Sequence, residues 1–167
     1  MNHDKQLTQI THRWFVTLLI TLAVGSVFYC WERIKVNIGE IEFSSSLSGF
    51  IKNIGTNVNV VEANIYYDFI FIIVYTALFY FSYRVFQSSM RVSVSKLWIL
   101  LCMLPGILDF IENLLLLYLI NNQDTTLVFS VLWCVVRAKW TLAIPFIIIN
   151  FYILIYYLLQ FINSFFK

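Results

Sequence analysis

The sequence contains few charged residues. Only 12% of its 167 residues are Asp, Glu, Lys or Arg, and 60% are hydrophobic, whereas a soluble domain carries about 25% charged residues. Such a chain cannot cover a water-facing surface with polar side chains. Disordered chains need the opposite composition, rich in charge and poor in apolar residues. An integral membrane protein is the class that remains.

Cysteine and histidine are also scarce. Cys30, Cys102 and Cys134 lie far apart without C-x-x-C spacing, so we expect no disulfide framework and no cysteine metal site. His3 and His12 both precede the first apolar segment. Zinc-type H-E-x-x-H, glycine-rich phosphate loops and G-x-S-x-G are missing, so we expect no metal and no cofactor. The net charge of +2 is too small to predict a nucleic-acid partner.

Four long apolar segments predict an all-α fold. About 20 apolar residues are needed to cross about 30 Å of hydrocarbon. The segments are residues 14–31, 63–83, 97–120 and 126–162. We predict a polytopic membrane protein, a single-domain bundle of four transmembrane helices with one outside loop at residues 32–62. The last segment contains Pro145 and predicts one helix that tilts, kinks or extends beyond the bilayer, with two short spans as the alternative.

The first segment has some features of a signal peptide. Ala23-Val24-Gly25 resembles a small-residue cleavage site. However, the apolar run continues to Trp31, and Trp14 stands at its other end. Because tryptophan often anchors helices at the membrane interface, we expect a retained helix with these two residues as anchors.

The distribution of Lys and Arg predicts the orientation, because these residues concentrate in cytoplasmic loops. They dominate the N-terminal segment, the loop after the second span and the C-terminus. The basic residues of these three regions are Lys5, Arg13, Arg84, Arg91, Lys96 and Lys167. The last outside loop holds only Asp124, and the first balances three basic residues with four acids, namely Arg33, Lys35 and Lys52 against Glu32, Glu40, Glu42 and Glu62. We therefore predict that both termini are cytoplasmic.

The long outside loop contains two patterns. Its first half partly alternates apolar and polar residues, which predicts a short strand; the apolar members are Val36, Ile38, Ile41 and Phe43. Residues 45–48 are serine-rich and offer helix N-caps. The apolar residues that follow have helical spacing and are Leu47, Phe50, Ile51 and Ile54. This helix is expected either to lie on the membrane surface or to pack on the bundle.

Five charged residues fall inside the apolar segments. They are Asp68, Asp109, Glu112, Arg137 and Lys139. Each costs about 2.5–3.5 kcal/mol at the centre of an inserted helix, so such residues pair or face a wet cavity. Helical periodicity adds polar neighbours on the same faces, namely Tyr75, Asn113 and Trp140. We predict that these eight residues form one polar cluster in the outer half of the bilayer. Its three acids and two bases require a protonated acid, a bound cation or a water molecule.

The ordered motifs resemble an uncharacterised family of small bacterial four-helix inner-membrane proteins. The shared pattern is D-x6-Y at Asp68 and Tyr75, D-x-x-E-N at residues 109–113 and K-W at residues 139–140. The resemblance implies a multi-pass protein of the bacterial inner membrane in which these residues form a common polar set. Arg137 lies outside the pattern, and no reaction is implied.

Three functions are compatible with these features. We favour a non-enzymatic membrane protein whose polar cluster orders the bundle and binds a lipid, an ion or a membrane partner protein. The alternative is an intramembrane enzyme acting on a lipid or lipid-linked substrate at the outer leaflet, with Asp109 or Glu112 as the base and Lys139 as an electrostatic stabiliser. The third is an oligomeric pore, which requires a homo-oligomer, or a membrane defence or immunity factor.

Overall fold

The computed structural model describes residues 3–55, 57–90, 96–122 and 125–165, and these residues form six helices and no strand. Four of the helices are long and apolar enough to cross a membrane. They are α1 (His3–Cys30), α4 (Val58–Met90), α5 (Lys96–Asn121) and α6 (Thr126–Phe165). The predicted all-α bundle of four membrane-spanning helices is thus confirmed. Three charges used to predict the orientation, Arg91, Asp124 and Lys167, lie outside the described residues.

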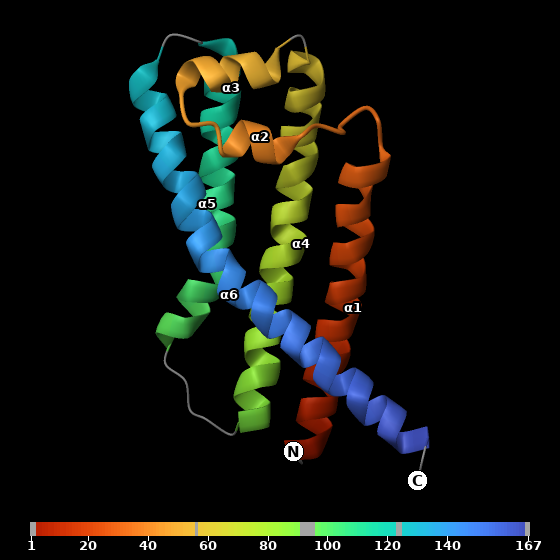
Figure 1. The fold of residues 1–167 in the computed structure, drawn as a ribbon. Helices are drawn as coiled ribbons and strands as arrows, with labels where there is room; N and C mark the ends of the chain where they lie inside the picture. The colour runs from red at the N-terminus through yellow and green to blue at the C-terminus, as the bar shows by residue number, and fades with distance from the viewer. Residues whose placement is uncertain (1–2, 56, 91–95, 123–124, 166–167) are drawn as a thin grey trace.

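Helix α4 occupies the centre of the bundle and packs against α1, α5 and α6. The two short helices, α2 (Ile38–Glu42) and α3 (Leu47–Ile54), lie together at one end of the bundle. Both chain termini lie at the opposite end (Figure 1). We call α2 and α3 the cap, and the two ends of the bundle the cap end and the terminal end.

Proline shapes the last two helices in different ways. Helix α6 continues through Pro145 as a single helix of 40 residues, and it slants across the bundle (Figure 1). The prediction of a single tilted helix is therefore confirmed, and the alternative prediction of two short spans is wrong. Pro105 lies inside α5, where its missing N–H and its ring disturb the helix. The green beginning of α5 leans away from its teal remainder in Figure 1.

The cap differs from the predicted strand. Residues Ile38–Glu42 form α2, so the strand prediction is wrong. An isolated strand in this position would leave its backbone N–H and C=O groups unpaired, whereas a helical turn pairs them internally. The helix predicted after the serines is confirmed as α3, with Ser46 Oγ accepting a hydrogen bond from the Gly49 N–H at 3.1 Å.

Helix α3 packs on the bundle rather than lying free on a membrane surface. Its Phe50 and Ile54, together with Ile41 of α2, are buried in one apolar layer with the cap ends of α4, α5 and α6. A second apolar layer surrounds Tyr75 and Phe79 in the middle of the bundle. Charged side chains that lie between these layers are therefore held away from bulk water.

A buried network of hydrogen bonds joins three helices near the terminal end. Trp14 Nε1 on α1 donates hydrogen bonds to Asn150 Oδ1 on α6 at 2.9 Å and to Ser82 Oγ on α4 at 3.2 Å. Trp14 is only 1% exposed, so its predicted role as an interface anchor is wrong. The tilt of α6 places Asn150 next to α1, where it accepts the hydrogen bond from the buried Trp14 indole.

Asn150→Ala removes the acceptor of this network and should lower the free energy of unfolding in mixed micelles by roughly 1 kcal/mol, the scale measured for hydrogen bonds between membrane helices. Asn121→Ala is the matched control, because Asn121 is exposed and bonds only to Leu117 of its own helix. Equal stability of the two variants would contradict a role of the network in holding α1.

Candidate functional site

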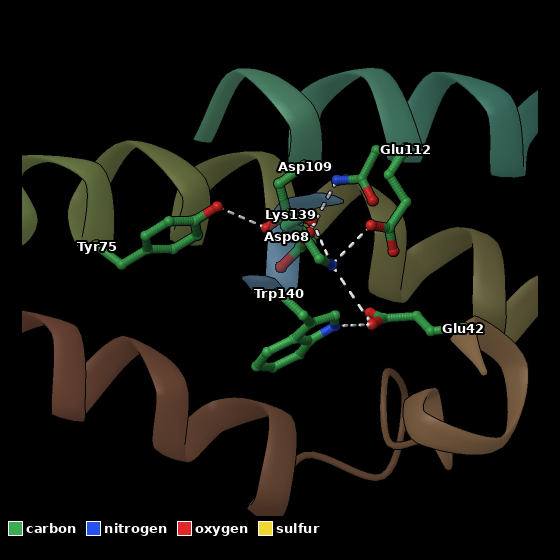
Figure 2. Close-up of polar contacts among 8 residues, drawn as sticks. Glu42, Asp68, Tyr75, Asp109, Glu112, Lys139 and Trp140 are labelled. Atoms are coloured by element: carbon green, nitrogen blue, oxygen red, sulfur yellow. Dashed lines mark hydrogen bonds and ion pairs between the residues drawn. The ribbon is translucent and has the colours of Figure 1, made fainter. Parts of the chain in front are cut away.

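The ammonium group of Lys139 is the centre of the predicted polar cluster. Its Nζ lies 2.7 Å from Glu112 Oε2, 2.9 Å from Asp109 Oδ1 and 3.4 Å from Glu42 Oε2. Figure 2 shows the three carboxylates converging on this one nitrogen. A single cation on α6 is thereby paired with two acids of α5 and one acid of the cap.

A second set of hydrogen bonds surrounds these ion pairs. The Tyr75 hydroxyl donates to Asp109 Oδ2 at 2.7 Å, and Asn113 Nδ2 donates to Asp68 Oδ2 at 2.9 Å (Figure 2). On the cap side, Trp140 Nε1 donates to Glu42 Oε2 at 2.9 Å. We call these eight residues the Lys139 cluster: Glu42, Asp68, Tyr75, Asp109, Glu112, Asn113, Lys139 and Trp140.

Helix geometry explains why the motifs meet. Asp109, Glu112 and Asn113 are three and four residues apart, so they share one face of α5. Asp68 and Tyr75 are two turns apart on α4 and flank that face. At about 1.5 Å per residue, Glu112 lies about 14 Å from the cap end of α5. The predicted clustering of α4 and α5 residues is what the structure shows.

The site is buried and holds more carboxyl groups than basic groups. Glu112 is 1% exposed and Lys139 is 5% exposed. Four carboxylates, those of Glu42, Asp68, Asp109 and Glu112, accompany one ammonium group. Since unpaired buried charge is expensive, protons on some carboxyl groups or a bound cation must balance the remainder. Across the residues that the structure describes, no group of three His, Cys, Asp or Glu side chains is arranged to hold a metal ion.

Arg137 was predicted to join the cluster, and this prediction is wrong. Its guanidinium lies 3.3 Å from the centre of the Trp133 ring and donates to the Trp133 carbonyl at 3.2 Å. Two residues apart on a helix, Arg137 and Lys139 point in nearly opposite directions, so only one of them can face the bundle. Stacking on the indole covers the charge that faces outward.

Glu42 belongs to the cluster but was not among the predicted site residues. It lies in the outside loop, where its charge entered only the orientation argument. A segment of five residues is too short for its hydrophobic period to distinguish helix from strand.

The chain matches no protein-family model, no curated protein and no solved structure. The resemblance to a family of small bacterial membrane proteins therefore stays a prediction.

Lys139→Met should lower the free energy of unfolding by about 3–5 kcal/mol, because it leaves three buried carboxylates without their cation. Arg137→Met, two residues away on the same helix, should cost less than about 1 kcal/mol, since it removes only a stacking contact and one exposed hydrogen bond, both to Trp133. Unfolding of both variants in mixed micelles measures the difference. Equal costs would contradict the central position of Lys139.

Proposed function

We propose that the chain is a non-enzymatic multi-pass protein of the bacterial inner membrane whose Lys139 cluster fastens the cap across the helix bundle. The observation that supports this most directly is the set of partners of Lys139. From α6, its ammonium group reaches Glu42 of the cap as well as Asp109 and Glu112 of α5. One side chain thus connects the membrane helices to the segment outside them.

The pairing pattern favours a fastening role over catalysis. Both oxygens of Asp109 are engaged, one by Lys139 and one by the Tyr75 hydroxyl. Lys139 itself is surrounded by carboxylates. A general base or an electrostatic stabiliser must present a free atom to its substrate. Asp109 and Lys139 are turned toward one another, and Glu112, the other candidate base, is 1% exposed with its Oε2 2.7 Å from Lys139 Nζ.

Uncharged hydrogen bonds hold the loop before α2 on the bundle and hold the two cap helices to each other. Asn64 Nδ2 of α4 donates to the Ile34 carbonyl at 2.7 Å, and Asn53 Nδ2 of α3 donates to the Glu40 carbonyl at 2.7 Å. These bonds join the loop before α2 to α4, and α2 to α3. The cap therefore presents a defined outer surface, which we propose is where a lipid, an ion or a membrane partner protein binds.

The distribution of charge supports an orientation with the termini in the cytoplasm. Lys5 and Arg13 of α1 and Arg84 of α4 lie toward the terminal end. The three basic residues toward the cap end are outnumbered by acids there, Arg33, Lys35 and Lys52 against Glu32, Glu40, Glu42 and Glu62. Basic residues concentrate on the cytoplasmic side of bacterial membrane proteins. In this orientation the cap faces the outside of the cell.

Glu42→Gln should loosen the cap without unfolding the bundle, because it removes the charge that pairs with Lys139 and weakens the hydrogen bond from Trp140. We expect amide hydrogens of residues 38–54 to exchange at least several-fold faster, while those of α4 keep their protection. The control is Glu40→Gln in the same short helix, since Glu40 is exposed and Gln keeps an oxygen for the Asn37 amide. Identical exchange in the two variants would contradict fastening through Glu42.

Asp109→Asn separates the fastening role from the enzymatic alternative. Loss of the charge weakens the bonds from Lys139 and Tyr75, and charged hydrogen bonds contribute about 1.5–3 kcal/mol. We expect the variant to unfold more readily, whereas the lipid extracts of cells expressing wild type, variant or empty vector should be the same. Unchanged stability together with a lipid species that depends on Asp109 would instead indicate an enzyme.

A further inference from the structure

An apolar groove lies between α4 and α5, away from the Lys139 cluster. Its volume is about 650 Å³. The lining side chains of α4 are Ile72, Ile73, Thr76, Ala77 and Tyr80, and those of α5 are Ile99, Met103, Gly106, Ile107 and Phe110. Several of them are exposed on the outside of the bundle, Ile73 to 71%. In a membrane, this surface faces hydrocarbon.

The groove has a basic end. Tyr80 lines it near the terminal end, and its hydroxyl accepts a hydrogen bond from Arg84 Nη1 at 2.9 Å. Arg84 lies one helical turn further along α4. Within the described parts of the chain, no carboxylate lies within ion-pair distance of Arg84. A guanidinium without an acidic partner among these residues therefore stands at one end of the apolar groove.

The dimensions of the groove fit one leaflet. From Ile72 to Tyr80, α4 rises about 12 Å, and Arg84 lies about 6 Å beyond, at about 1.5 Å per residue. One leaflet contributes about 15 Å of hydrocarbon. An extended acyl chain in the groove would thus end near Arg84, at the depth where lipid phosphates lie.

We propose that the groove binds an anionic phospholipid of the leaflet at the terminal end, with one acyl chain between α4 and α5 and the phosphate on Arg84. Charge complementarity selects this occupant. The fork of guanidinium N–H groups matches phosphate oxygens, and a cation at this depth attracts anionic lipids. The site is separate from the Lys139 cluster and goes beyond the proposed fastening role.

Native mass spectrometry of the full chain tests this proposal with two probes of identical acyl chains, phosphatidylglycerol and phosphatidylethanolamine. The wild type should retain one phosphatidylglycerol in preference to phosphatidylethanolamine. Arg84→Gln should weaken phosphatidylglycerol binding roughly fivefold, the effect of about one basic contact, and remove the preference. Ala77→Phe should abolish binding of both lipids by filling the groove.

Arg13→Gln is the matched control, because Arg13 is an exposed arginine near the terminal end of α1, which does not line the groove. It should bind phosphatidylglycerol like the wild type. If Ala77→Phe does not give a folded monodisperse protein by circular dichroism and size exclusion, Ile73→Trp obstructs the groove from an exposed position.

Three results would overturn the proposal. They are equal affinity for the two lipids in the wild type, an equal loss in Arg84→Gln and Arg13→Gln, or full binding after the groove is filled. A dimer that disappears in the groove-filling variant, with lipid binding unchanged, would show that a second copy of the chain occupies the groove instead.

Discussion

The contact that the rest of the structure depends on is the pairing of one buried ammonium group with carboxylates from two other elements. In a low-dielectric interior an unpaired charge is far more costly than a paired one. Lys139 must therefore face α5, and α5 must turn its acidic stripe toward α6. Glu42 brings the cap to the same point. Pairing this single ammonium group with carboxylates determines how α5 and α6 face each other and where α2 lies.

Polar contacts determine how the helices face one another, because apolar packing in a membrane does not favour one helix register over another. Lipid tails are as apolar as leucine, so burial alone does not select one helix register over another. Two polar networks at different depths supply the selection. The Lys139 cluster joins α4, α5, α6 and the cap, while Trp14 and Asn150 join α1 to α6 near the terminal end. Together they hold α6 at its slant across the bundle.

Much of this arrangement could be predicted from the sequence because it depends on local periodicity. Bilayer thickness determines the length of the spans, and helical spacing placed Asp109, Glu112 and Asn113 on one face. The failures depend on tertiary packing. The tilt of α6 buries Trp14, and the packing of the cap against the bundle brings Glu42 to Lys139. Neither result can be predicted from the spacing of residues along one helix. Arg137 was a different failure, since its helical angle to Lys139 already opposed a shared site.

The most direct test is whether removing an acid compensates for removing the cation. If the ammonium group is required because carboxylates surround it, Lys139→Met combined with Glu112→Gln should be more stable than Lys139→Met alone, because among the described residues Glu112 pairs only with Lys139. Interaction energies between contacting groups are about 0.5–3 kcal/mol, and unfolding in mixed micelles resolves this range. The account predicts partial recovery of stability in the double variant. A double variant whose losses simply add would contradict it.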